Sequence, residues 1–253
     1  MTDPHNSHSA GRPLNLVVVA AGTSVPSSTR MLADQLTAAT RDALARHGQR
    51  VDVTVLEARE LAHEVVDATF TRFPGEKLAA AIDEIGRADG LIAVTPIYNQ
   101  SFSGLFKSLF DVIQAGTIAG VPVALGATGG TARHSLAVDY ALRPMFAYLK
   151  ADVVPTTVFA ASEDFGAVAT DGDEDSLRAR TARVGTELSD YMLRFAGVTA
   201  GAVAPTRADA GGRTCPRRGV RPGPDADRQR GSGCPSVGSR GGTAPRSVPS
   251  SAS

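Results

Sequence analysis

A run of hydroxyl side chains between residues 22 and 30 is the part of the sequence best suited to chemistry. It follows a short apolar run at 16–21 and precedes leucines at helical spacing, so we expect a strand, a turn and the start of a helix. Such a turn directs backbone N–H groups at one point, where the helix dipole also favours negative charge. The segment therefore predicts a phosphate-binding loop. Its polar side chains are Thr23, Ser24, Ser27, Ser28, Thr29 and Arg30.

The same segment has a simpler interpretation as a helix cap, because Ser and Thr are preferred N-cap residues. One cap uses one hydroxyl, and five hydroxyls in seven positions exceed that need. The glycine spacings of a dinucleotide-binding turn and of a P-loop are both absent. The pattern thus favours a phosphate site of a different kind.

Two further polar loops follow apolar runs of the kind that form buried strands. They are Pro-Ile-Tyr-Asn-Gln at 96–100 and Thr-Gly-Gly-Thr at 128–131. If the strand order is 2-1-3-4-5, the exits of strands one, three and four lie side by side and make one site. These loops offer hydroxyls, amides and glycines but few acids, bases or nucleophiles. We therefore expect a cofactor that carries its own chemistry and no catalytic side chain.

Strand and helix patterns alternate five times, which predicts an α/β fold with a parallel sheet between two layers of helices. Residues 57–73 are expected to be a longer connection, with Phe70, Phe73 and Pro74 as turn or packing residues. The expected strands are 16–21, 51–56, 90–95, 122–127 and 153–159, and the expected helices are 31–47, 76–87, 103–113, 136–149 and 176–195.

Composition divides the chain of 253 residues into a body and a tail. Residues 197–253 hold nine Arg, three Asp and no Lys or Glu, a net charge of +6, so the rest carries −6 because the chain total is zero. The tail is rich in Gly, Pro and Ser, and we expect it and the leader 1–13 to be disordered, which leaves 14–196 as the domain. Out-of-frame translation of GC-rich DNA is an alternative origin for such a tail.

The sequence disfavours nucleic-acid binding, metal binding and a membrane location. A basic tail without aromatic residues to stack on bases gives only weak support for nucleic-acid binding, so none is expected. Both cysteines, Cys215 and Cys234, lie in the tail, and the five histidines show no metal-ligand spacing. No apolar run has the length of a signal peptide or a membrane span, so we expect a cytoplasmic protein.

Three motifs together resemble the NADPH-dependent FMN reductase family of flavodoxin-like proteins, in particular its actinobacterial-type branch. The resemblance covers about Leu14 to Ala196 and implies a flavodoxin-like three-layer sandwich with a five-stranded parallel sheet of order 2-1-3-4-5. One departure is the opening Gly-Thr-Ser-Val-Pro, where the family commonly has Gly-Ser-x-Arg. The motifs are Gly22 to Arg30, Thr95 to Asn99 with Ser103-Gly104-x-x-Lys107-x-x-x-Asp111, and Ala127-Thr128-Gly129-Gly130.

The resemblance implies three groups of contacts to FMN and no metal. His134 is a further candidate, either for contact with nicotinamide or the flavin edge or for a capping or packing role at a helix start. Packing at the sheet edge is the alternative for Tyr98, and a turn is the alternative for Asn99. The phosphate contacts are Thr23, Ser24, Ser28, Thr29 and Arg30, the ring contacts are Pro96, Ile97, Tyr98 and Asn99, and those at the pyrimidine end are Thr128, Gly129, Gly130 and Thr131.

The activity implied is transfer of hydride from NADPH or NADH to FMN. The resemblance also implies a homodimer or tetramer, and a flavin-dependent monooxygenase is a candidate partner that receives reduced FMN. The segment 103–113 with Phe102, Phe106 and Phe110 is the candidate interface, and ordinary core packing is its alternative. A flavodoxin-type electron carrier and a quinone or azo reductase with bound FMN are the alternative functions.

Overall fold

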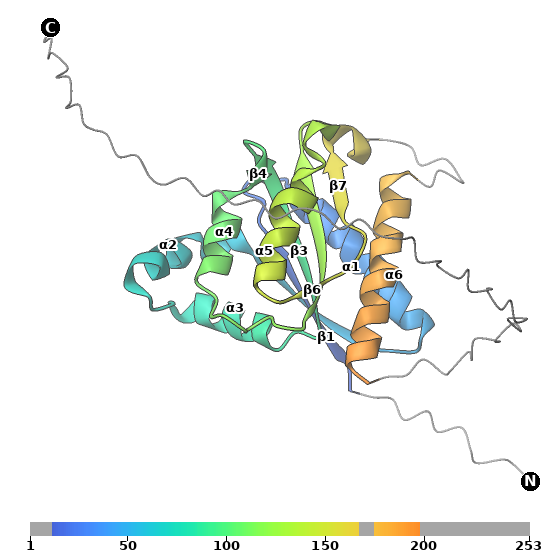
Figure 1. The fold of residues 1–253 in the computed structure, drawn as a ribbon, viewed down its shortest axis with the longest axis horizontal. Coiled ribbons are helices and arrows are strands. Elements are labelled where there is room, and N and C mark those ends of the chain that lie inside the picture. The colour runs from blue at the N-terminus through green and yellow to red at the C-terminus, as the bar shows by residue number, and fades with distance from the viewer. Residues whose placement is uncertain (1–11, 167–174, 198–253) are drawn as a thin grey trace, which may run out of the picture. The chain divides into compact units, whose positions relative to one another are not determined.

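The computed structural model describes residues 12–166 and 175–197, so most of the leader and nearly all of the tail lie outside the described residues. A mainly parallel sheet runs through the body with helices packed against it (Figure 1). The predicted α/β sandwich is confirmed. The parallel strands are β1 (Leu14–Ala20), β2 (Val51–Glu57), β3 (Gly90–Tyr98), β5 (Pro122–Gly129), β6 (Asp152–Val153) and β7 (Val158–Ala161), and β4 (Ser101–Phe102) pairs antiparallel with β3.

The strand order is β2-β1-β3-β5-β6, and β7 also pairs with β5. With β5 as the fourth parallel strand, this is the predicted order 2-1-3-4-5. The single fifth strand predicted over 153–159 is divided, because β6 pairs with the start of β5 and β7 with its end. Pro155 lies between the two pieces, and a proline has no N–H to give to the ladder.

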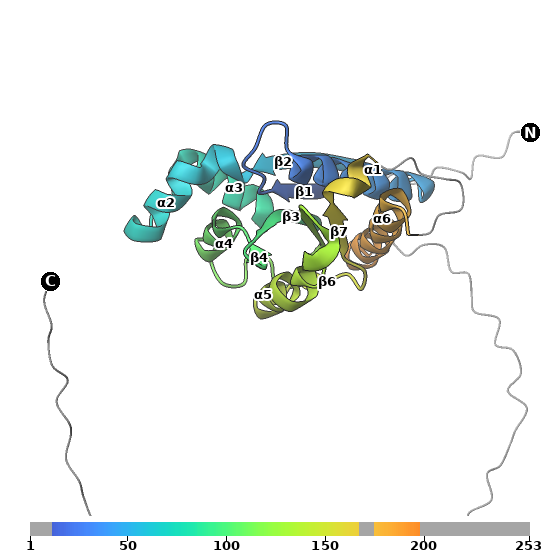
Figure 2. The same ribbon diagram turned by 90° about the horizontal axis from the view of Figure 1, so that it is seen from above.

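Alternating side chains of β1 supply the cores on both faces of the sheet. Val17 and Val19 pack with α3, α4 and α5, whereas Leu16 and Val18 pack with α1 and α6. Figure 2 shows α1 and α6 on one side of the sheet and α4 and α5 on the other. The continuous apolar run of β1 follows from this burial on both faces. The helices are α1 (Ser28–Arg46), α2 (Ala62–Thr71), α3 (Glu76–Gly86), α4 (Gly104–Asp111), α5 (Arg143–Tyr148) and α6 (Leu177–Phe195).

The connection predicted over 57–73 is wrong, because most of it is helical. A short 3₁₀ turn, Ala58–Leu61, leads into α2 at the outer edge of the molecule (Figure 2). Only Val65 and Ala68 of α2 are buried, while Phe70 and Phe73 are 82% and 79% exposed. A helix with so narrow a buried stripe gives little apolar periodicity in the sequence.

The helix predicted over 136–149 is present in a modified form. It begins as a π-helical turn, η3 (Val138–Leu142), in which the Arg143 N–H donates to the carbonyl of Val138 five residues back. Pro144 stands at the start of α5 and has no N–H for the bond that would normally continue the ladder. The wider turn accommodates this missing donor.

Two of the three aromatic residues of the candidate interface lie in the core, while Phe102 is half-buried. Phe106 and Phe110 are 0% and 2% exposed. The ring centroids of Phe110 and Phe146 lie 4.9 Å apart. The core-packing alternative therefore holds for Phe106 and Phe110, and an interface along 103–113 stays a prediction. Lys107 and Asp111 form an ion pair on the exposed side of α4. Among the described helices, none has the length and hydropathy to span a bilayer.

Candidate functional site

The loops that follow β1 and β3 meet at the carboxyl ends of these neighbouring strands, where a hydroxyl pair joins them. The hydroxyl of Thr23 lies 3.1 Å from that of Tyr98. A second pair joins the start of α1 to the end of β5, because the hydroxyl of Thr29 lies 2.9 Å from that of Thr128. The structure thus brings together the three polar segments that the strand order predicted to be adjacent.

The first loop is closely packed around its glycine and its cap. Ser27 is the N-cap of α1, and its hydroxyl accepts the N–H of Arg30 at 3.2 Å. A Cβ on Gly22 would lie 2.0 Å from that hydroxyl oxygen, so a side chain here would displace the capping hydroxyl. The capping interpretation therefore holds for Ser27. Thr23, Ser24 and Ser28 are exposed and remain available to a ligand.

Thr29 and Thr128 face each other inside the protein. Their residues are 2% and 3% exposed, and each hydroxyl is the partner of the other. The buried pair fixes the first turn of α1 against the third loop. Both residues were predicted to contact FMN, and in this structure their hydroxyls bind each other.

Arg30, predicted as a phosphate contact, is held by two carboxylates. Its Nε donates to Asp34 at 2.8 Å and its Nη1 donates to Glu57 at 2.6 Å. The hydrogen bond to Asp34 is the main reason why the pKa of Arg30 is raised above its ordinary value. The guanidinium therefore stays charged beside the loop, with part of its hydrogen-bonding capacity used within the protein.

Two residues that sequence reasoning missed complete this side of the loop. Glu57, the last residue of β2, also pairs with Arg59 at 2.5 Å, and Arg59 donates to the carbonyl of Ser24 at 3.4 Å. Both follow a strand that was not assigned to the site. The signal that could have found them is the strand order, since β2 ends next to β1 in a parallel sheet.

The second loop is a hairpin that extends β3 beyond its predicted end. Asn99 and Gln100 form a two-residue turn with φ of 49° and 72° before β4, so the turn interpretation of Asn99 is confirmed. Buried Thr95 anchors the base, because its hydroxyl accepts the N–H of Ser103 at 3.1 Å. The side chains of Pro96 and Ile97 are buried, and that of Tyr98 is 51% exposed. Tyr98 therefore presents its ring where the first and second loops meet.

The third loop has open backbone followed by two basic residues. A Cβ on Gly129 would lie 2.8 Å from the ring of Phe159, whereas one on Gly130 would meet nothing within 4 Å. Thr131 and Arg133 are exposed. His134 is half-buried, and its Nδ1 is enclosed without a hydrogen-bond partner among the described residues. That nitrogen faces protein, so any contact of His134 with a ligand would have to use another part of its ring.

The donors gathered at the first loop fit a phosphate monoester. Three exposed hydroxyls, the first-turn N–H groups of Ser28 and Thr29, and two nearby guanidiniums are the groups that bind such an anion. The described part of the chain shows no cluster of three metal-ligating side chains. The site thus combines a cluster of anion-binding donors with neutral hydrogen-bonding loops.

Comparison with known proteins identifies similar FMN reductases and a similar solved structure. An FMN reductase (NADPH) of Pseudomonas aeruginosa is 39% identical over 155 residues, which cover 60% of this chain and 80% of that protein. An NADH-dependent FMN reductase of Pseudomonas putida is 37% identical, with 60% and 79% covered. The crystal structure of an oxidoreductase from Corynebacterium diphtheriae superposes with a TM-score of 0.68 at 39% identity and covers 72% of this chain and 98% of its own. The sequence profile of NADPH-dependent FMN reductases matches residues 14–166, and the chain belongs to that family.

Proposed function

We propose that this protein reduces FMN with NADPH or NADH at the site formed by the three loops. The observation that carries the proposal is the joining of the first loop to both others by the Thr23–Tyr98 and Thr29–Thr128 hydroxyl pairs. It joins the anion-binding donors of the first loop to the two neutral loops. When bound, FMN supplies the hydride-accepting ring, and the protein supplies binding and orientation.

The exposed polar groups of the first loop bind the phosphate. Thr23, Ser24 and Ser28 donate hydroxyls, the first turn of α1 donates N–H groups, and Arg30 adds positive charge. The backbone of 97–100 and of Gly129–Thr131 approaches the ring edge, which the open space beside Gly130 allows. N–H groups placed there stabilise the negative charge that develops during hydride transfer. No side chain needs to act as an acid or a base.

A reductase is favoured over an electron carrier by the shortage of aromatic cover. Tyr98 is the one aromatic side chain that the described loops expose at this site, so one face of the ring stays open to a nicotinamide. We place the enzyme in the cytoplasm, where reduced nicotinamide is produced. We further propose a homodimer or tetramer, which passes reduced FMN to an acceptor such as a flavin-dependent monooxygenase.

Anaerobic stopped-flow absorbance tests the function directly. The protein is mixed with FMN and then with NADPH or, in parallel, NADH, while the visible flavin band is followed. Rapid bleaching with many turnovers of added FMN is the expected result. Tight FMN binding without reduction would favour the carrier, and absence of FMN binding would rule out the three-loop site.

Replacing Ser28 tests the position of the phosphate. Ser28→Ala removes an exposed hydroxyl at the start of α1, and we expect FMN to bind about three- to tenfold more weakly. Riboflavin, which has no phosphate, serves as the matched ligand and should bind the variant and the parent protein equally. Equal losses for the two flavins, measured by fluorescence titration, would place the phosphate elsewhere.

A further inference from the structure

Glu57 occupies an unusual position, because one carboxylate holds two arginines beside the proposed phosphate loop. Its Oε1 accepts from Arg30 at 2.6 Å and its Oε2 pairs with Arg59 at 2.5 Å. Each oxygen therefore has its own guanidinium. The Glu57 side chain is 16% exposed, while those of Arg30 and Arg59 are 36% and 30% exposed. The cluster is accessible to water and to a ligand.

The charges of this cluster cancel before any ligand arrives. Arg30 also pairs with Asp34, so two guanidiniums face two carboxylates. Both arginines adjoin the loop, since Arg30 is the third residue of α1 and Arg59 donates to the carbonyl of Ser24. A phosphate dianion that enters the loop thus meets a neutral cluster, although two cations stand next to it.

We propose that Glu57 is a positioning residue that limits phosphate affinity and so keeps FMN exchangeable. It holds Arg30 and Arg59 beside the loop and competes with the flavin phosphate for their guanidiniums. The ligand class is a phosphate monoester dianion, and the inference rests on the proposed function, which puts that group at the first loop. An enzyme that treats FMN as a substrate needs such a limit, because reduced FMN has to leave after each turnover.

The charge argument gives the direction of the effect. Replacing Glu57 with glutamine keeps the shape and one acceptor oxygen for an arginine but leaves the cluster with an excess positive charge. Coulomb attraction between one charge and a dianion several ångströms away in a largely aqueous setting is equivalent to about a three- to tenfold change in affinity. The change should appear as slower release of FMN.

The experiment compares Glu57→Gln with Asp52→Asn in fluorescence titrations of FMN and riboflavin. Asp52 is an exposed carboxylate at the other end of β2, about 16 Å away along the strand, so its replacement changes net charge equally but acts through solvent. We expect Glu57→Gln to bind FMN about three- to tenfold more tightly, with riboflavin unchanged. Asp52→Asn should resemble the parent protein for both flavins.

Two further measurements identify the cause. Adding Arg30→Gln to Glu57→Gln should remove the gain, because the cluster then holds one guanidinium, Arg59, and one carboxylate, Asp34, and its net charge returns to zero. In the parent protein, the affinity for FMN should depend weakly on salt, and in Glu57→Gln the dependence should be steeper. The salt series on the parent protein tests the proposal even if Glu57→Gln does not fold.

The outcomes separate this inference from the function on which it rests. If folded Glu57→Gln binds FMN equally or more weakly, or if the parent protein shows a steep salt dependence, Glu57 does not limit affinity and the inference is wrong. If the parent protein binds neither FMN nor riboflavin, the proposed function itself fails. If FMN binds and is reduced but Glu57→Gln shows no gain, only the inference fails.

Discussion

The hydroxyl side chains of the first loop differ in what they contact, and the difference sets what each can do. Ser27 caps α1, and Thr29 is enclosed with Thr128. Thr23 bonds to Tyr98, whereas Ser24 and Ser28 face solvent. Some of the loop's hydroxyls therefore form hydrogen bonds that hold the loop and the start of α1 in place. The remainder is preorganised for an anion, which lowers the cost of ordering it on binding.

The buried hydroxyl pair gives a prediction for stability. Thr29→Val leaves the hydroxyl of Thr128 enclosed without its partner, so we expect a loss of about 1–3 kcal/mol in the free energy of unfolding. The double replacement Thr29→Val with Thr128→Val removes both groups and should be much less destabilising. Urea titration of Thr29→Val, Thr128→Val, the double variant and the parent protein measures this. A loss for the double variant equal to the sum of the two single losses would show that the pairing contributes nothing.

The hydroxyl loop at 23–29 could be found from the sequence, whereas the cluster of Glu57 and Arg59 beside it was missed. The loop could be read because its hydroxyls are adjacent along the chain and precede a helix. Glu57 and Arg59 are harder to find, because they lie at and just after the end of a different strand. The pairing of Glu57 with Arg30 depends on how β2 lies beside β1. Burial likewise separates Thr29 from Ser28, although the two residues are adjacent and chemically alike.

Among the elements, α1 and α6 approach each other closely where Gly185 faces α1. A Cβ at Gly185 would lie 2.6 Å from the backbone carbonyl carbon of Ala39 and 2.7 Å from the Thr40 nitrogen. These are backbone atoms, so they cannot move away as a side chain could. The small residue therefore sets the distance between the two helices that cover one face of the sheet.

Replacing this glycine should separate the helices. We expect Gly185→Ala to cost about 1–3 kcal/mol in the free energy of unfolding, because the added methyl overpacks the contact. Gly104→Ala is the matched control, since its Cβ would meet nothing within 4 Å at the start of α4. The control should be neutral or slightly stabilising, as alanine favours helix. Thermal unfolding followed by circular dichroism compares them, and similar melting temperatures would contradict the close-packing argument.

The sequence predicted elements where apolar periodicity is strong and failed where it is weak. The expected strand 16–21 and helix 76–87 correspond to β1 and α3, which bury a continuous run and a regular stripe. The expected connection over 57–73 conceals α2, whose exposed Phe70 obscures its narrow buried face. The division at Pro155 and the π turn before Pro144 arise from missing N–H donors rather than from hydrophobic pattern.

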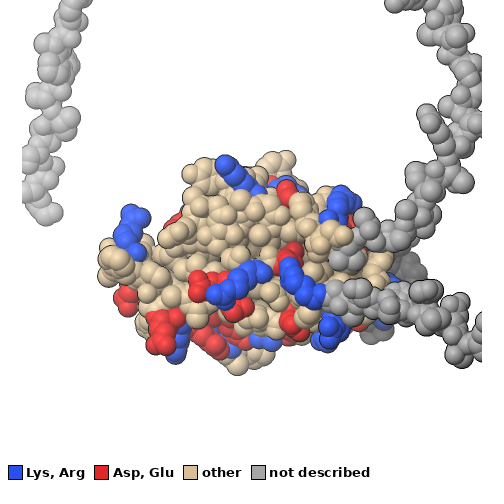
Figure 3. Space-filling model, turned by 90° about the horizontal axis from the view of Figure 1, so that it is seen from below, with Lys and Arg blue, Asp and Glu red and all other residues tan. Residues whose placement is uncertain are grey.

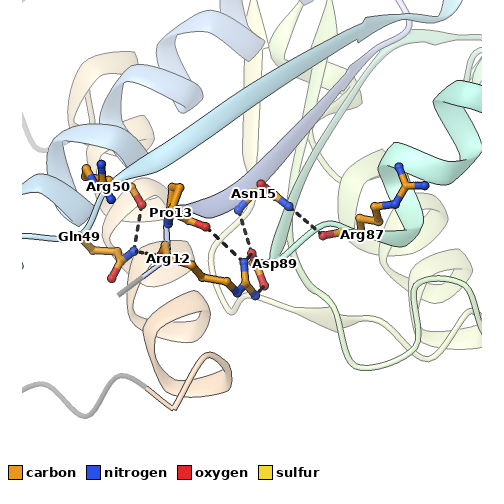
Figure 4. A network of polar contacts seen from close by, with 7 residues as sticks. All are labelled: Arg12, Pro13, Asn15, Gln49, Arg50, Arg87 and Asp89. Atoms are coloured by element: carbon orange, nitrogen blue, oxygen red, sulfur yellow. Dashed lines mark hydrogen bonds and ion pairs between the residues drawn. The ribbon is translucent and has the colours of Figure 1, made fainter. Parts of the chain in front are cut away.

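For the molecule as a whole, the end of the sheet opposite the site is fastened by a polar network. Asp89, just before β3, accepts two bonds from Arg12 at 2.6 and 2.8 Å and one from the Asn15 N–H at 2.8 Å (Figure 4). Figure 3 shows this end of the molecule with positive and negative side chains interspersed. The network joins the chain before β1 to the turn before β3. Because it pairs opposite charges, it does not make a surface patch of one charge.

This network predicts a pH-dependent stability that leaves the site unaffected. Partial burial acts to raise the pKa of Asp89, but the hydrogen bonds from Arg12 and Asn15 and the charge of Arg12 lower it by more. Its stabilising contribution is therefore complete above the ordinary carboxyl pKa and is lost as pH falls through the lowered value. Asp89→Asn should cost about 1 kcal/mol near pH 7, because Arg12 is well exposed and solvent screens the pair.

The measurement is the melting temperature of Asp89→Asn and the parent protein as a function of pH. The two curves should converge in acid, where the parent also carries a neutral side chain at this position. FMN affinity should be the same in both, because the network lies at the amino ends of the strands. A constant difference at all pH values would assign the loss to packing instead of charge.

The position of β1 between β2 and β3 also determines how the chain can fold during synthesis. Leu16 pairs with Gly90, and β3 in turn pairs with β5, so the centre of the sheet is assembled from distant parts of the chain. When β1 and α1 leave the ribosome, one edge of that apolar strand has no partner until residues beyond 90 emerge. Parallel pairings over such separations form slowly and leave intermediates prone to aggregation. The same strand that places the hydroxyl loop at the centre of the site thus leaves the nascent chain with an unpaired apolar edge until β3 has been synthesised.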